Sequence, residues 1–148
     1  MPARYPVPAD VHQLVTPQGC PAAHRGSYVW ADPGPGGGRP NNWLDATGHR
    51  AWQRDQASGQ YFLHSFLDRQ PDLNWREPAV HEAFGEILRF WFGRGVAGFR
   101  IDAAHMLYQD ADLRDDPLAR AGGSLHAPFG LDQARSANQP ETHEVFRT

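Results

Sequence analysis

The segment 98–102, Gly-Phe-Arg-Ile-Asp, is the feature that most constrains what this chain can fold into. It follows a helical run that ends at Gly95, and its residues are typical of a short β-strand. Side chains alternate between the two faces of a strand, so Arg100 and Asp102 share one face and the two apolar residues share the other. The sequence therefore predicts a buried strand that ends in a guanidinium and a carboxylate placed side by side.

The pair Arg100–Asp102 has two interpretations. In barrels of alternating strands and helices, the C-terminal ends of the strands carry the chemistry. A cation beside a carboxylate favours the charged form, which a nucleophile requires. A structural ion pair is the alternative, and the spacing by itself favours it at least as much. The residues alone leave both interpretations open.

A helix is predicted from Pro78 to the glycines at 93 and 95. Proline is suited to the first turn of a helix, where its missing N–H has no partner to lose, and glycine is a common C-terminal cap. The apolar residues recur at helical spacing, which predicts packing against a sheet. They are Val80, Phe84, Ile87, Leu88 and Trp91. A helix followed so closely by a strand is typical of a parallel α/β sheet.

A β-hairpin is predicted upstream of this helix. Its arms are residues 51–55 and 60–66, and the turn 56–59 between them ends in glycine. A short strand is expected at 27–30 and a loop at 32–40. For His64, in the second arm, we favour a packed residue with one satisfied nitrogen over a residue that lines a substrate cleft.

The polar loop 70–76 precedes the helix and contains Asp72, Asn74 and Trp75. A carboxylate, an amide and an indole close together suit sugar hydroxyls and the apolar faces of sugars. The same residues could hold the loop and prepare the next helix. We place structural support slightly ahead of sugar contact.

The remaining segments are less informative. The acidic stretch 110–116 does not match a calcium loop, so a solvated loop is expected. Residues 122–139 are expected to be irregular, and 141–147 to open a helix in which His143 and Glu144 have no catalytic role. The proline-rich residues 1–26 are expected to be irregular or disordered.

Composition excludes several classes of partner. The net charge is −3, so neither nucleic acid nor an anionic membrane surface is expected as a partner. The chain contains one cysteine, which excludes an internal disulfide. No apolar run is long enough to span a bilayer, and the N-terminus lacks the pattern of a signal peptide. A cytoplasmic location follows as the expectation, and no cofactor or metal ion is predicted.

Two motifs carry a resemblance to a known family. Residues 98–102 resemble the nucleophile segment of the α-amylase family of glycoside hydrolases, and 70–75, Gln-Pro-Asp-Leu-Asn-Trp, resemble a signature of its α-glucosidase or oligo-1,6-glucosidase branch. The resemblance implies an α/β fold, a fragment of a (β/α)8 TIM barrel with one helix–strand unit and part of an inserted subdomain that contains the hairpin. The resemblance begins at residue 27, so 27–69 are expected to be part of the inserted subdomain and 70–148 a partial catalytic barrel. Residues 1–26 do not match the family pattern and are set apart as an irregular N-terminus.

The same resemblance implies roles for single residues. Asp102 corresponds to the nucleophile and Arg100 to the residue that orients it. Asp72, with Asn74, belongs to the loop signature and is usually structural. No metal ligand is implied.

Two positions after the nucleophile correspond to substrate-binding sites. Branch members with alanine at the position of Ala103 tend to prefer α-1,4 bonds, because a smaller side chain leaves room for the leaving sugar. His105, followed by methionine, departs from the Lys-His pair of polymer-cleaving amylases. The expected substrate is therefore a maltose-like, α-linked gluco-oligosaccharide.

Retaining hydrolysis needs a nucleophile and a second carboxyl as acid/base. The family's acid/base glutamate and its later Asn-His-Asp segment are not found in this sequence, and a complete barrel needs about 250 residues. The chain is therefore expected to be an internal piece of a retaining α-glucosidase that is inactive alone. The alternatives are a transglycosylating relative, such as a trehalose-forming isomerase, and a non-catalytic barrel homologue used for protein contacts. Retention of Arg100 and Asp102 argues against the last.

Overall fold

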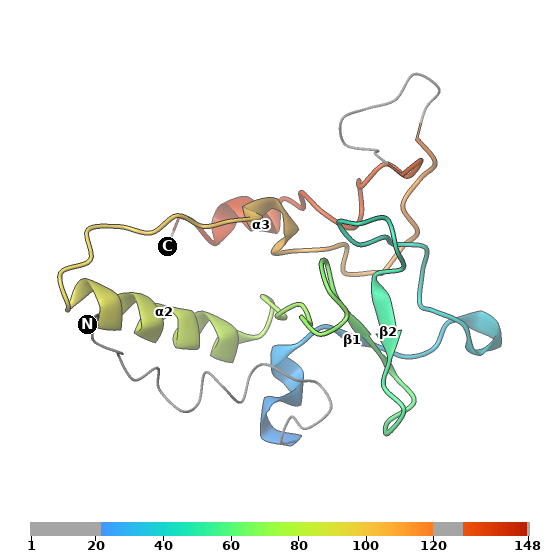
Figure 1. The fold of residues 1–148 in the computed structure, drawn as a ribbon, viewed down its shortest axis with the longest axis horizontal. Helices are drawn as coiled ribbons and strands as arrows, with labels where there is room; N and C mark the ends of the chain where they lie inside the picture. Colours follow the sequence, from blue (N-terminus) through green and yellow to red (C-terminus); the bar gives the residue numbers. More distant parts are fainter. Residues whose placement is uncertain (1–21, 120–128, 148) are drawn as a thin grey trace, which may run out of the picture.

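The computed structural model describes residues 22–119 and 129–147. A small antiparallel sheet occupies one side of the molecule, and a long helix extends away from it (Figure 1). The elements are η2 (Ala22–Ser27), β1 (Trp30–Ala31), η3 (Pro35–Gly37), β2 (Trp52–Arg54), β3 (Tyr61–Leu63), α2 (Pro78–Phe92), η4 (Ala104–Met106) and α3 (Glu141–Glu144). The irregular N-terminus predicted for 1–26 lies mostly outside the described residues, and its last part forms η2 instead.

The predicted hairpin is confirmed. Strands β2 and β3 pair antiparallel, with Trp52 opposite Leu63 and Arg54 opposite Tyr61. The turn between them needs a left-handed residue, which Gly59 supplies at φ +76°. Strand β1 adds to the other edge of β3, so the sheet order is β1-β3-β2.

The first strand begins later than the sequence predicted. It covers Trp30–Ala31, whereas residue 28 makes an isolated bridge with Leu73. The backbone N–H of Val29 donates to the carbonyl of Asp72 at 3.1 Å. The segment expected to be a strand is thus divided between the sheet and the loop that follows β3.

Two stacked tryptophans form the centre of the core. Trp43 and Trp52 are each 1% exposed, and their ring centroids lie 5.9 Å apart. Small and apolar side chains complete the cluster: Ala31, Ala51, Tyr61 and Leu63. The indole N–H of Trp52 donates to Asn41 Oδ1 at 2.7 Å, so the buried polar atom is satisfied.

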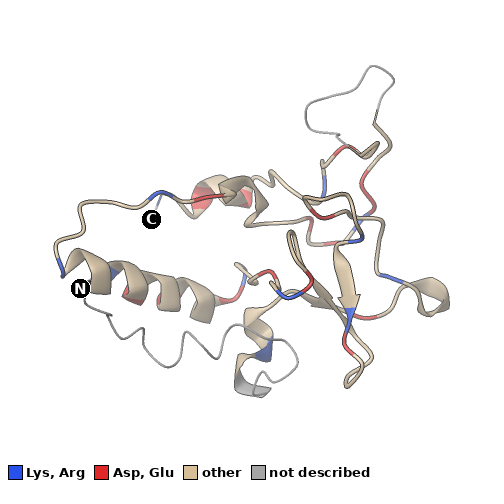
Figure 2. Ribbon diagram, viewed as in Figure 1, with Lys and Arg blue, Asp and Glu red and all other residues tan. Residues whose placement is uncertain are grey.

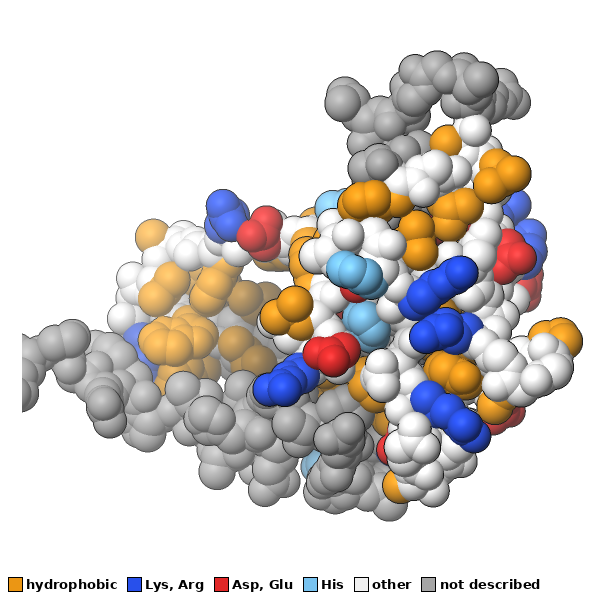
Figure 3. Space-filling model, turned by 45° about the vertical axis from the view of Figure 1, so that its right-hand side comes forward, with side chains coloured by type: hydrophobic (Ala, Val, Ile, Leu, Met, Phe, Trp, Pro, Cys, Tyr) orange, Lys and Arg blue, Asp and Glu red, His pale blue; other side chains and the backbone are white. Residues whose placement is uncertain are grey.

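Helix α2 has the predicted bounds but not the predicted packing. Gly93 caps it, and Gly95 adopts φ +86°. Of its apolar stripe only Val80 is buried, and Leu88 is 36% exposed. The helix extends away from the sheet (Figure 1), and hydrophobic side chains gather on this part of the surface (Figure 3). No helix among residues 22–119 and 129–147 is long and apolar enough to cross a membrane.

The predicted strand at 98–102 is absent. Residues 97–102 make no backbone–backbone hydrogen bond with the described part of the chain, and Ile101 is 54% exposed. A strand exists only by pairing with a neighbour, and the sheet β1-β3-β2 does not extend to this segment. Local contact is retained, because the rings of Phe92 and Phe99 meet edge to face at 5.3 Å.

The acidic stretch 110–116 is a loop, but the prediction that it is solvated was wrong at both ends. Asp116 is 3% exposed, and its carboxylate accepts from the backbone N–H groups of Arg135 and Ser136. The side chain of Asn42 makes two bonds to the backbone of Asp116, at 2.8 Å each: its Nδ2 donates to the carbonyl, and its Oδ1 accepts from the N–H. The loop is therefore fixed to the hairpin side of the molecule. Elsewhere acidic and basic residues are interspersed along the chain (Figure 2).

The other end of this loop is held by an ion pair. Asp110 is 6% exposed, and Arg114 Nε donates to its Oδ2 at 2.8 Å. Hydrogen bonds from the Arg114 guanidinium lower the pKa of Asp110 to about 2. The segment opening at residue 141 forms α3, as predicted, although as a single turn from Glu141 to Glu144.

Replacing Trp52 tests the placement of the core. Trp52→Ala removes the ring stacked on Trp43 and the bond to Asn41, so we expect the free energy of unfolding to fall by about 3–5 kcal/mol. Urea unfolding followed by circular dichroism measures the change. The control Leu67→Ala alters a residue that is 60% exposed, and a change below about 0.5 kcal/mol is expected. Equal losses for both variants would contradict the assigned core.

Replacing Asp110 tests the ion pair through acid unfolding. A pKa lowered in the folded chain stabilises it above the ordinary value of 3.8, and this stabilisation is lost as the pH falls toward about 2. We expect Asp110→Asn to be less stable at pH 7 and to lose less further stability between about pH 4 and 2 than the parent chain. Denaturant midpoints measured across this range provide the test. Asp68→Asn, at an exposed position, should keep the parent profile; an unchanged profile for Asp110→Asn would refute the pair.

Candidate functional site

The pair predicted from the sequence is formed. Arg100 Nη2 lies 2.6 Å from Asp102 Oδ2, so the guanidinium and the carboxylate are side by side. The expectation that they are buried is wrong, because the two side chains are 83% and 82% exposed. The reason is the missing sheet, since a strand without neighbours on either side leaves both of its faces open.

The second carboxylate oxygen is held by the chain itself. The backbone N–H of Ala103 donates to Asp102 Oδ1 at 3.2 Å. Ala103 adopts φ +50°, a left-handed conformation that is uncommon for a residue with a side chain. The chain turns there into η4, and the N–H of Met106 donates to the carbonyl of Ala103. The carboxylate is therefore oriented by the cation two residues earlier and by the turn that follows.

His105, the other predicted substrate-binding residue, lies in η4 and is exposed. Its carbonyl accepts from the backbone N–H of Asn138 at 2.7 Å. This bond connects the segment after Asp102 to the residues that lead into α3. None of the hydrogen bonds among the described residues involves the imidazole ring of His105. Its role in substrate binding therefore stays a prediction.

Asp72 holds the loop that follows β3. Its carboxylate accepts from the backbone N–H of Ser65 at 2.8 Å and from the hydroxyl of the same residue. Its own backbone N–H donates to the carbonyl of Leu63. Burial raises the pKa of Asp72, although the bonds from Ser65 act in the opposite direction. The geometry places Asp72 in a supporting position rather than at an open surface.

Asn74 prepares α2. Its side-chain oxygen accepts from the backbone N–H of Arg76 at 3.1 Å, and its carbonyl accepts from Glu77. Its backbone N–H donates to the carbonyl of Ser27, which fixes the loop against η2. His64 is 4% exposed, and its Nδ1 lies 3.3 Å from the carbonyl of Phe66, as expected of a packed histidine.

Sequence reasoning missed a set of contacts that joins the polar loop 70–76 to residues 108, 109 and 141. Arg76 Nη2 donates to the carbonyl of Gln109 at 2.7 Å and to Glu141 Oε1 at 3.0 Å. The hydroxyl of Tyr108 donates to the carbonyl of Trp75 at 2.9 Å, and burial raises the pKa of Tyr108. Arg76 is 33 residues from Gln109 and 65 from Glu141 in the sequence, so no local pattern could have indicated these bonds.

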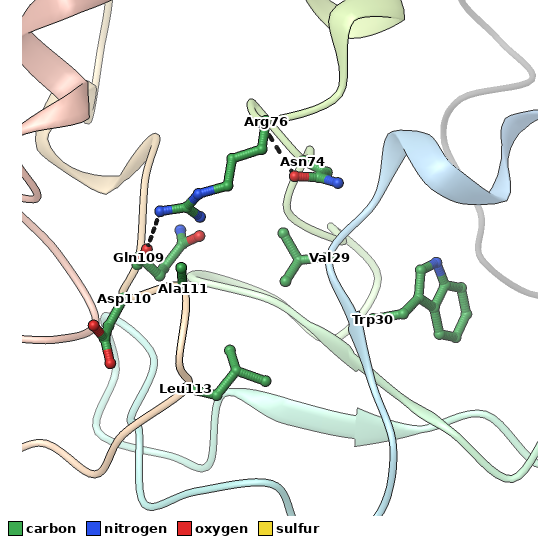
Figure 4. A pocket seen from close by; sticks show the side chains of 8 residues that line it. All are labelled: Val29, Trp30, Asn74, Arg76, Gln109, Asp110, Ala111 and Leu113. Atoms are coloured by element: carbon green, nitrogen blue, oxygen red, sulfur yellow. Dashed lines mark hydrogen bonds between the residues drawn. The ribbon is translucent and has the colours of Figure 1, made fainter.

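A pocket of about 190 Å³ lies beside Arg76 (Figure 4). We call it the Arg76 pocket; the residues that line it are Val29, Trp30, Asn74, Arg76, Gln109, Asp110, Ala111 and Leu113. Neither residue of the Arg100–Asp102 pair belongs to its lining. Within the described residues, no group of three or more His, Cys, Asp or Glu side chains could hold a metal ion.

Comparison with known proteins finds relatives over most of the chain. Residues 15–148 match the family model for the catalytic domain of alpha-amylase. An alpha-glucosidase of Culex pipiens is 45% identical over 118 residues, which is 80% of this chain and 20% of that protein. An oligo-1,6-glucosidase of Parageobacillus thermoglucosidasius is 41% identical over 92 residues, 62% of this chain and 16% of that protein. The chain thus spans about a fifth of the length of such relatives.

Solved structures agree. An alpha-glucosyl transfer enzyme, XgtA, matches with a TM-score of 0.76 and 39% identity over 93% of this chain and 26% of its own. Trehalose-6-phosphate hydrolase of Bacillus licheniformis matches with a TM-score of 0.73 and 31% identity over 90% of this chain and 22% of its own. The range matched by the family model contains both motifs. The chain belongs to the alpha-amylase family of glycoside hydrolases.

Proposed function

We propose that this chain contributes the nucleophile segment of a retaining α-glucosidase-type enzyme, with Asp102 as the nucleophile and Arg100 as the residue that orients it. The observation that carries the proposal is the 2.6 Å ion pair at the position of the motif. Relatives named alpha-glucosidase and oligo-1,6-glucosidase support the substrate class, an α-linked gluco-oligosaccharide such as maltose. Ala103 and the exposed His105 lie next to the nucleophile, where they would meet the sugar.

The geometry suits covalent catalysis. One Asp102 oxygen is held by Arg100 and the other by the N–H of Ala103, so the carboxylate has a fixed orientation and keeps free lone pairs. Attack on the anomeric carbon forms a glycosyl–enzyme ester as the bond to the leaving oxygen breaks, and that oxygen takes a proton from an acid. Water, deprotonated by the same group, then releases the sugar with retention. The acid/base carboxyl must come from elsewhere in the enzyme.

We further propose that residues 70–148 form one helix–strand unit of a (β/α)8 barrel and that 27–69 belong to the subdomain inserted before it. The match of XgtA over 93% of this chain supports this assignment. Most of the apolar stripe of helix α2 is not buried. The segment that follows the helix contacts its C-terminal end, where Phe99 packs against Phe92. Both features suit an element whose sheet neighbours complete it.

The 148 residues by themselves should not turn over substrate. Retaining cleavage needs an enclosed sugar site in which two carboxyls lie about 5–5.5 Å apart. The pair Arg100–Asp102 is instead more than 80% exposed. We therefore infer that activity requires further residues of the enzyme around this pair.

A transglycosylating enzyme is the second candidate. XgtA is described as an alpha-glucosyl transfer enzyme, and an isomaltulose synthase from Erwinia rhapontici matches with a TM-score of 0.65 and 34% identity. Transfer and hydrolysis share the glycosyl–enzyme step and differ in whether a sugar or water accepts the glucosyl group. A non-catalytic homologue is disfavoured, because protein contacts alone do not require the pair Arg100–Asp102.

A chimera tests the nucleophile. Residues 27–147 would replace the matching segment of the Culex pipiens alpha-glucosidase, and hydrolysis of p-nitrophenyl α-glucoside would be followed. We expect activity in the chimera and a fall of kcat by at least about 10⁴-fold in Asp102→Asn, because removal of a nucleophile stops the covalent step. Asp68→Asn should leave the rate unchanged.

Product analysis separates the two candidates. Free glucose from maltose indicates hydrolysis, and a new glucosyl-glucose linkage indicates transfer. Undiminished activity of Asp102→Asn would remove Asp102 from the mechanism. Turnover by the 148-residue chain that Asp102→Asn abolishes would show that no further residues are needed.

A further inference from the structure

The Arg76 pocket holds unused hydrogen-bonding groups. Both bonds of Arg76 to Gln109 and Glu141 use Nη2, so Nε and Nη1 have no acceptor among the described residues. Gln109 is 4% exposed; its Nε2 donates to the carbonyl of Met106 at 2.8 Å, and its Oε1 receives no bond from the described part of the chain. The pocket is therefore lined by a guanidinium that keeps unpaired N–H groups and by one fixed amide acceptor.

The opposite wall is apolar. Val29, Ala111 and Leu113 face the same space from the chain before β1 and from the loop 109–113 (Figure 4). The ring of Trp30 and the carboxylate of Asp110 turn away from it (Figure 4). A planar guanidinium and an amide oxygen suit neighbouring hydroxyls, and aliphatic walls suit the C–H face of a sugar ring.

The charges around the pocket and its volume limit which ligands can bind there. Arg76 is paired with Glu141 at 3.0 Å, and Asp110 with Arg114, so the pocket carries no unpaired charge that would favour an ionic ligand. The volume of 190 Å³ corresponds to about six liquid waters at ~30 Å³ each, which suits one sugar ring and not two. A neutral ligand with several hydroxyls fits best.

We propose that the Arg76 pocket binds one neutral hexose unit, at a position separate from Asp102. This site goes beyond the proposed function and does not rest on it, because none of its residues takes part in the glycosyl–enzyme step. A ligand of this size, held by three polar groups in a half-open pocket, binds with a dissociation constant of the order of millimolar. The segments that line the pocket also carry the bond between Arg76 and Gln109, so occupancy would rigidify the contact between the polar loop and residue 109.

Titration with glucose tests the site directly. The ¹⁵N-labelled 148-residue chain would be titrated to about 100 mM D-glucose, well above a millimolar dissociation constant. We expect saturable shifts of the Gln109 side-chain amide, the Arg76 Nε–H and the backbone amide of Ala111. Inorganic phosphate and glycerol, the probes for anion binding and for unspecific polyol binding, should give none.

Two variants locate the ligand. Ala111→Leu fills the pocket from an exposed position, and Arg76→Lys keeps the charge but loses the planar fork. Both should weaken glucose binding by at least about tenfold, the loss expected of one charge-assisted bond. Ala79→Leu, an exposed helix residue outside the lining, should bind as the parent chain does.

Four results would overturn the site. They are an absence of saturable shifts at Gln109 and Ala111, equal shifts with glycerol or phosphate, retained binding in Ala111→Leu with a native spectrum elsewhere, and loss of binding in Asp102→Asn. The last would place the sugar at the nucleophile segment and would leave the proposed function standing.

Discussion

The buried indole of Trp43 imposes the constraint on which the described structure depends. The ring is 1% exposed, and its N–H must find an acceptor or lose a hydrogen bond in the core. The acceptor is the carbonyl of Arg114, 71 residues away, at 2.9 Å. Asn41 and Asn42, the two residues before Trp43, bond to Leu113 and Asp116, which flank Arg114. The loop 110–116 therefore closes against the hairpin side of the molecule.

The contacts of Arg76 and Tyr108 depend on this closure. With the loop 110–116 fixed, residues 108 and 109 lie beside the end of the polar loop, and Arg76 and Tyr108 can bond across the gap. The loop 72–76 is in turn held by Asp72 to β3. The polar loop is therefore joined to residues 108 and 109 through bonds from long side chains to backbone carbonyls, while the hydrophobic core lies on the hairpin side.

Sequence patterns predicted what is local and missed what is distant. The hairpin, with Gly59 in its turn, and α2, bounded by Pro78 and Gly93, depend on backbone preferences of neighbouring residues. The burial of Asp110 and Asp116 depends on partners four to twenty residues away, which an acidic stretch does not reveal. The strand at 98–102 failed for a similar reason, because pairing needs strands that the described residues do not supply. The motif nonetheless identified the family, since chemistry fixes residue types even where the fold around them is incomplete.

The contrast among four carboxylates argues for the role of Asp102. Asp72, Asp110 and Asp116 each accept bonds that fix a loop, from Ser65, Arg114 and residues 135–136. Within the described residues, Asp102 bonds only to Arg100, two positions earlier, and to the N–H of the next residue. Those contacts orient the carboxylate but connect no distant parts of the chain, because so short a loop costs little to close. An oriented acid that connects no other part of the described chain is consistent with the proposal that Asp102 acts as the nucleophile.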